Sequence, residues 1–128
     1  MTELHPFIVG AFKEKHTFET RKTEADRIKT KYPNQIPVIL ERAKKTSISF
    51  IDKNKYLVPA NLTVGQFIYT IKKRINTSET TAIFLFVNNR FLPPLNHLMS
   101  QVYKEYQDKD GFLYVTFAAE MTFGNKLN

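Results

Sequence analysis

The clearest hydrophobic pattern lies in the middle of the chain, where apolar residues recur at the spacing of one helical face. Counted from Val64 to Ile75, they occupy positions i, i+3, i+4, i+7 and i+11. Thr63 and Gln66 stand three residues apart at the start, as in a capping box. Residues 72–74 are all basic, which suits the carboxyl end of a helix dipole. The pattern predicts a helix over residues 62–75.

Three further segments have helical character. Phe18, Ala25, Ile28 and Tyr32 can share a narrow stripe in an otherwise charged segment that Pro33 ends. A shorter helix is expected over about residues 9–15, and another over residues 98–107. The two helices at the amino-terminal end have the composition of surface helices that pack on something else.

Other segments have the composition of strands. Residues 36–43 (IPVILERA) form a short apolar run, and residues 42–47 are expected to turn into a second strand within residues 47–62 that closes at Pro59. A third strand is expected over residues 82–92, with a turn at Asn88 and Asn89. Asp110 and Gly111 predict a turn before a last strand over residues 112–119.

The predicted order is two helices, two strands, a helix, a strand, a helix and a strand. This order indicates an α+β fold in which one helix packs across a mixed sheet. The fold class expected is the ubiquitin-like β-grasp, with a four-stranded mixed sheet and two added amino-terminal helices. A length of 128 residues is typical of one domain and allows a sizeable core.

Composition argues against an enzyme and against a resident cofactor or metal. The chain has no cysteine, its serines lack the G-x-S-x-G context, and its three histidines are scattered. Its four glycines lie far apart, so no phosphate-cradling loop is expected. No secretory signal and no apolar run long enough for a membrane span are visible. We therefore expect a chain that is soluble as made and resides in the cytoplasm.

A net charge of +7 favours acidic partners of three kinds, namely nucleic acid, anionic membrane or acidic protein segments. Many aromatic residues in a basic chain would suit base stacking on a sheet. No recognition-module signature for nucleic acid is present, however, and most aromatic residues fit core or pocket positions. The expectation is therefore that nucleic acid is not a partner.

Several motifs together resemble one known family. They are KYPNQIPVI, IDKNKYLVPANLTVGQFIYTIKKRI, IFLFVNN, LPP and DKDGFLYVTF, followed by TFG. On these the chain is similar to the autophagy-related ubiquitin-like modifiers of the GABA-receptor-associated and light-chain-3 type. The resemblance covers about nine-tenths of the chain, and residues 52–75 carry its most specific part. It implies the same β-grasp fold.

The resemblance also implies a modifier that a cysteine protease cleaves after Gly124, which Phe123 precedes. An activating enzyme then adenylates the glycine with ATP, a carrier enzyme receives it as a thioester, and it ends amide-linked to phosphatidylethanolamine. The implied locations are the cytoplasm and the autophagosome membrane. The expected organisation is an extension over residues 1–10, a domain over 11–121 and a flexible tail over 122–128, of which residues 125–128 are removed. A monomer is expected.

The resemblance further implies that the chain recruits cargo receptors by binding an aromatic-x-x-aliphatic peptide as an added strand at the KYLVP edge. The expected aromatic pocket consists of Glu24, Ile28, Pro37, Ile39, Lys55, Leu57 and Phe112. The expected aliphatic pocket consists of Tyr56, Val58, Pro59, Leu62, Phe67 and Thr70. Contacts to acidic residues that flank the peptide motif are expected from Lys53, Lys55 and Arg74.

The chain departs from the family pattern at several places. Thr70 stands where the family has leucine, and Gln35 where it has arginine, so peptide preference is expected to differ. The segment NNRFLPP is one residue longer than usual. Two alternatives stay open. Ile28, Leu57 and Phe67 could be plain core, and the chain could be an unprocessed adaptor in vesicle trafficking or cytoskeletal attachment.

Overall fold

The chain folds in the predicted order of helices and strands. The computed structural model describes residues 11–43, 54–75 and 81–119. The elements are α1 (Ala11–Lys15), α2 (Phe18–Lys31), β1 (Gln35–Arg42), β2 (Lys55–Pro59), α3 (Val64–Arg74), β3 (Phe84–Val87), α4 (Met99–Tyr106) and β4 (Leu113–Ala118).

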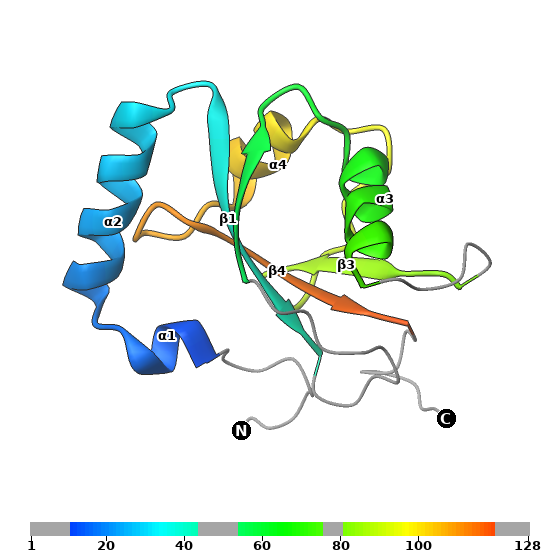
Figure 1. The fold of residues 1–128 in the computed structure, drawn as a ribbon, viewed down its shortest axis with the longest axis horizontal. Helices are drawn as coiled ribbons and strands as arrows, with labels where there is room; N and C mark the ends of the chain where they lie inside the picture. The colour runs from blue at the N-terminus through cyan, green and yellow to red at the C-terminus, as the bar shows by residue number, and fades with distance from the viewer. Residues whose placement is uncertain (1–10, 44–53, 76–80, 120–128) are drawn as a thin grey trace.

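The four strands form one mixed sheet in the order β2-β1-β4-β3 (Figure 1). The central strands β1 and β4 are parallel, and each pairs with an antiparallel outer strand. Pro37 of β1 lies opposite Leu57 of β2, and Val38 lies opposite Leu113 of β4. The predicted four-stranded mixed sheet is therefore confirmed, with β2 at one edge.

The main core lies between one face of the sheet and helices α3 and α4. The apolar face predicted for α3 is confirmed, because Val64, Phe67 and Ile71 are each only 1% exposed. The capping box at Thr63 and Gln66 is present, with both of its hydrogen bonds. Capping satisfies amide groups that would otherwise lack partners at the start of the helix.

Helices α1 and α2 lie on the other side of the sheet (Figure 1). Ala25 of α2 is buried there with Phe12 and Ile39. The predicted stripe on this helix was too long. Phe18 is 44% exposed, and Tyr32 follows the helix as its carboxyl-terminal cap, because the helix touches the sheet only along its middle turns.

The third strand is shorter than predicted and ends at Val87. Asn88 and Asn89 have φ angles of 52° and 60°, in the left-handed region that asparagine tolerates better than most residues. The backbone reverses there, so that Phe91 pairs back with Val87 in an isolated bridge. Residues 47–53 of the predicted second strand and residues 9–10 of the predicted first helix lie outside the described residues.

Candidate functional site

The outer edge of β2, which carries the KYLVP segment, alternates between exposed and more buried side chains. Lys55 and Leu57 are exposed, whereas Tyr56 is half-buried and Val58 is only 2% exposed. In the part of the chain that the structure describes, the sheet order places no strand beyond β2. Its outer backbone groups can therefore receive another extended chain.

A cavity of about 230 Å³ opens between α2 and this edge. Its walls come from α2, β1, β2 and the residue before β4. It is lined by Ile28, Pro37, Val38, Lys55, Tyr56, Leu57 and Phe112. These include all of the predicted aromatic-pocket residues except Glu24 and Ile39. Ile39 lies in the buried cluster of Ile28 and Phe112, and therefore supports the wall.

An ion pair joins α2 to β2 beside this cavity. Lys55 donates a hydrogen bond of 2.5 Å to Glu24, which is how Glu24 joins the site. The Lys55 side chain is 45% exposed and that of Glu24 is 24% exposed. Exposed pairs of this kind contribute at most about 1 kcal/mol. A ligand with its own carboxylate can therefore replace Glu24 as the partner of Lys55 at low cost.

A fully buried carboxylate fixes the far wall of the cavity. Asp110 accepts hydrogen bonds from the Arg21 guanidinium (2.6 Å), the Tyr114 hydroxyl (2.5 Å) and the Phe112 amide (2.8 Å). Burial of Tyr114, with this hydrogen bond, raises the pKa of the phenol. The network ties α2 to the start of β4, and so holds Phe112 and α2 in place.

The sequence predicts only a turn at Asp110 and Gly111. The bond from Asp110 to the amide two residues later is typical of Asp in turns, so that part of the network had a local signal. The partnership with Arg21 spans 89 residues and had none. Gly111 has a φ of 99°, and a Cβ there would lie 2.9 Å from the Cβ of Ala25, so only glycine fits where α2 passes.

The residues predicted to form the aliphatic pocket lie on β2, on α3 and between these two elements, and some of them are core. Val58 and Phe67 belong to the main core, and Tyr56 and Leu62 pack against it. The rings of Tyr56 and Phe67 meet edge to face at 6.2 Å. The exposed members are Pro59 and Thr70.

Thr70 donates its hydroxyl to the backbone carbonyl of Gln66 at 3.1 Å, which leaves its methyl group as the apolar surface of that position. Arg74, at the end of α3, is exposed, and its guanidinium lies 6.0 Å from the Tyr56 ring. Lys53, Phe123 and Gly124 lie outside the described residues.

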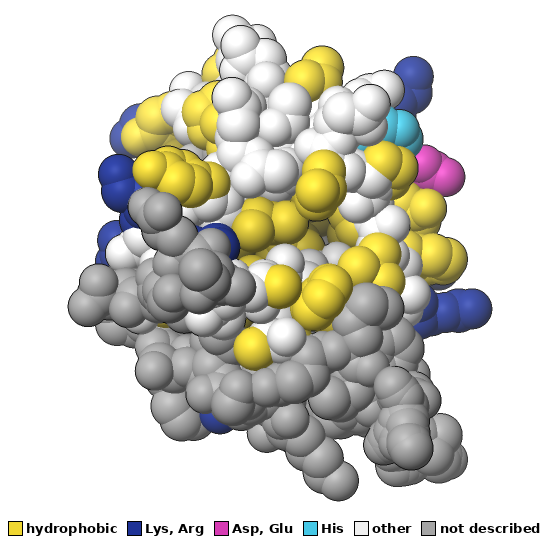
Figure 2. Space-filling model, turned by 90° about the vertical axis from the view of Figure 1, so that its right-hand side faces the viewer, with side chains coloured by type: hydrophobic (Ala, Val, Ile, Leu, Met, Phe, Trp, Pro, Cys, Tyr) yellow, Lys and Arg dark blue, Asp and Glu magenta, His cyan; other side chains and the backbone are white. Residues whose placement is uncertain are grey.

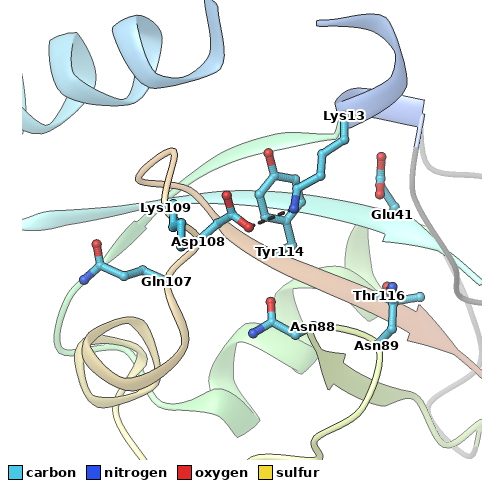
Figure 3. A pocket seen from close by; sticks show the side chains of 9 residues that line it. All are labelled: Lys13, Glu41, Asn88, Asn89, Gln107, Asp108, Lys109, Tyr114 and Thr116. Atoms are coloured by element: carbon cyan, nitrogen blue, oxygen red, sulfur yellow. Dashed lines mark hydrogen bonds and ion pairs between the residues drawn. The ribbon is translucent and has the colours of Figure 1, made fainter. Parts of the chain in front are cut away.

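A second, polar cavity of about 380 Å³ was not predicted (Figure 3). Its lining consists of Lys13, Glu41, Asn88, Asn89, Gln107, Asp108, Lys109, Tyr114 and Thr116. Lys13 donates to Asp108 at 2.8 Å and lies 4.6 Å above the Tyr114 ring. Burial alone would raise the pKa of the Asp108 carboxyl, but the bond to Lys13 helps to lower that pKa below its ordinary value.

Among the described residues, no three His, Asp or Glu side chains come together as ligands for a metal ion. None of the described helices has the length and apolar character needed to cross a bilayer.

A family model and similar curated proteins all point to one family. The family model described as "Autophagy protein Atg8 ubiquitin like" matches residues 20–124. The chain is 58% identical over 114 residues to autophagy-related protein 8 of Coccidioides immitis, covering 89% of this chain and 97% of that one. It is 57% identical to the protein of the same name from Emericella nidulans, covering 89% and 96%.

Two solved structures that resemble this chain belong to proteins of the same name. Trypanosoma brucei ATG8 superposes with a TM-score of 0.81 at 34% identity, covering 86% of this chain and 94% of that one. Plasmodium falciparum Atg8, solved in complex with a peptide of Plasmodium falciparum Atg3, superposes with a TM-score of 0.77 at 38% identity, covering 88% and 98%.

Proposed function

This chain belongs to the Atg8 family of ubiquitin-like autophagy proteins, and we propose that it is a modifier that is conjugated through Gly124 to phosphatidylethanolamine. In addition, it recruits partners through the edge of β2. The cavity of about 230 Å³ beside that edge is the observation that carries the recruiting function. The alignment with the family up to Gly124 supports the conjugating function.

Peptide binding follows from two features of the edge. An extended peptide takes up the outer backbone hydrogen bonds of β2, and its aromatic side chain enters the cavity against Leu57 and Phe112. Successive side chains of an added strand point to opposite faces of the sheet, so a residue three positions later points away from α2, past Tyr56 and towards α3. There it meets Leu62 and Thr70, which explains an aromatic-x-x-aliphatic motif.

Acidic residues beside the motif would meet the cations of this edge. Lys55 already holds a carboxylate from Glu24, so the site is shaped to accept one. Arg74 and Lys53 extend the basic surface in this proposal. Loss of the family's arginine at Gln35 removes one such cation, which reduces the expected gain from acidic flanks.

The conjugation proposed is a chain of acyl transfers carried out by partner enzymes. A cysteine protease hydrolyses the bond between Gly124 and Asn125, which frees the glycine carboxylate. An activating enzyme forms the adenylate from ATP and releases pyrophosphate. A thiolate displaces AMP, the thioester passes to a carrier enzyme, and the lipid amine displaces that thiol. Glycine lacks a Cβ, so catalytic groups can approach its carbonyl closely.

A phosphatidylethanolamine anchor would explain how a chain of this kind reaches the autophagosome membrane from the cytoplasm. One acyl chain holds a protein to a bilayer only marginally, whereas two hold it stably. The Plasmodium falciparum relative was solved with an Atg3 peptide. By analogy, we propose that the carrier enzyme of this chain also presents a peptide to the protein. Cargo receptors would then compete for the same edge.

Calorimetric titration with a synthetic aromatic-x-x-aliphatic peptide tests the recruiting function. Leu57→Ser should weaken binding at least about tenfold, because it removes an apolar wall of the cavity. Leu95→Ser is the matched control, since Leu95 is 63% exposed and lies on another part of the surface. Equal effects of the two variants, or none, would refute the assignment of this cavity.

A further inference from the structure

Exposed apolar side chains gather on the connection between β3 and α4 and on the neighbouring helix α3. Phe91, Leu92 and Leu95 are 38%, 45% and 63% exposed, and Tyr69 is 57% exposed. They make up four of the six exposed large hydrophobic residues among those described. We call these four residues the loop patch. Contiguous exposed apolar residues indicate an interaction surface, whereas single ones do not.

The loop patch is held together by contacts with both helices. The Leu95 carbonyl accepts a hydrogen bond of 3.0 Å from the Gly65 amide, so the loop lies directly against the start of α3. Tyr69 stands one helical turn after Gly65, on the same face. At the other end, Phe91 stacks on Tyr106 of α4 with ring centroids 4.9 Å apart.

Two prolines lie between the leucines of the loop patch. Pro93 and Pro94 restrict the backbone, so Leu92 and Leu95 are held at the surface with little conformational freedom. Neither leucine belongs to the main core cluster.

Cations accompany the aromatic members of the loop patch. The Lys73 ammonium lies 5.5 Å from the Tyr69 ring, and the Arg90 guanidinium lies 5.3 Å from the Phe91 ring. Within the described residues, neither cation forms an ion pair with a carboxylate. Figure 2 views the side of the molecule that carries α3 and shows hydrophobic side chains across that side, with Lys and Arg side chains at its left and right edges.

We infer that the loop patch is a contact surface for anionic lipid bilayers. Aliphatic side chains at the tip would enter the acyl boundary, while aromatic residues and their cations would lie at the level of the headgroup phosphates. The basic net charge of +7 complements such a surface. The contact is independent of Gly124 and of the peptide cavity, so it would operate before any lipid is attached and would orient the chain afterwards.

Vesicle sedimentation with the full-length, unlipidated chain tests the inference. Vesicles contain phosphatidylcholine alone or with about 30% phosphatidylserine. We expect binding to the anionic vesicles that falls about tenfold in a Leu92→Ser, Leu95→Ser double variant and weakens as salt increases. Leu57→Ser is the control, and should bind vesicles like the unchanged chain although its peptide binding is weakened.

A fluorescence measurement checks insertion directly. The chain has no tryptophan, so Leu95→Trp introduces a single reporter on an exposed position. Its emission should shift to the blue with anionic vesicles and stay unchanged with an acidic peptide. No shift with vesicles, or vesicle binding that the double variant leaves intact, would overturn the inference. A shift with the acidic peptide alone would assign the loop patch to a protein partner instead.

Discussion

Replacement of Asp110 by asparagine should destabilise the protein far more than its size would suggest. The Asp110 side chain is fully buried, and its two oxygens accept three hydrogen bonds. One oxygen receives both Arg21 and Tyr114, and the other receives the Phe112 amide. Asparagine has nearly the same shape, so Asp110→Asn changes charge and hydrogen bonding while leaving the packing volume almost constant.

The magnitude follows from what asparagine cannot do. Its amide nitrogen donates and cannot accept, so whichever way the side chain is turned, at least one buried donor loses its acceptor. The Arg21 charge also loses its partner. Removing one member of a buried ion pair costs roughly 3–5 kcal/mol. Because the Arg21 side chain is 12% exposed and water can reach it, we expect the lower end, about 3 kcal/mol.

Asp26→Asn provides a matched control. Asp26 pairs with Lys22 at 3.2 Å on the surface of α2, and their side chains are 58% and 50% exposed. Exposed pairs of this spacing contribute about 0.3–0.5 kcal/mol. Both variants therefore replace an aspartate of an ion pair by asparagine, once in a buried network and once at the solvent-exposed surface.

Urea unfolding followed by circular dichroism measures both variants. With an m-value of about 2 kcal/mol per molar, the midpoint should fall by about 1.5 M for Asp110→Asn and by less than about 0.3 M for Asp26→Asn. If the two shifts were equally small, the buried network would not hold α2 to β4. The account of how the cavity wall is fixed would then be wrong.

Three further changes test other parts of the structure. Gly111→Ala should cost at least about 2 kcal/mol in urea unfolding, because its φ of 99° disfavours a side chain and the new Cβ would meet Ala25. Asp108→Asn should reduce the loss of unfolding free energy as the pH falls into the acid range. Lys13 holds the pKa of this carboxyl below its ordinary value of 3.8, so its contribution is present above that pH and is lost as pH falls through the lower folded-state pKa. Thr70→Leu should tighten peptides with an aliphatic anchor about fivefold in calorimetry, since leucine restores an apolar wall.

Each of these has a result that contradicts it. Gly65→Ala is the control for Gly111, because a Cβ there makes only a 3.4 Å contact and its shift should stay within about 1 kcal/mol. Parallel stability curves for the unchanged chain and Asp108→Asn between pH 5 and about pH 2 would remove the pKa argument. Unchanged peptide affinity in Thr70→Leu would show that position 70 does not form the pocket.

The sequence predicted those elements whose signals are local. Helix α3 carries its own capping box and one apolar face, so Thr63 and Ile71 were placed correctly. Leu57 was placed correctly as an exposed pocket residue, whereas Val58, also expected in a pocket, is buried in the main core. Phe18 was misplaced, because a helical stripe does not reveal how far the partner surface extends.

Contacts distant in sequence were beyond prediction from the residues alone. Nothing local pairs Arg21 with Asp110, or places Leu95 beside Gly65. Apolar residues also look alike whether they form core or pocket. Ile39 is fully buried beneath the cavity, whereas Leu57 lines it, and only the packing of α2 on the sheet distinguishes them.

The central claim, conjugation through Gly124, is tested most directly by the intact mass of the protein from its own cells, beside a Gly124→Ala variant. The account predicts a form that lacks residues 125–128 and a form that has also gained the mass of phosphatidylethanolamine, with both absent from the variant. A full-length, unmodified chain as the sole species in both samples would contradict it, and would leave an adaptor that binds peptides without being attached to lipid.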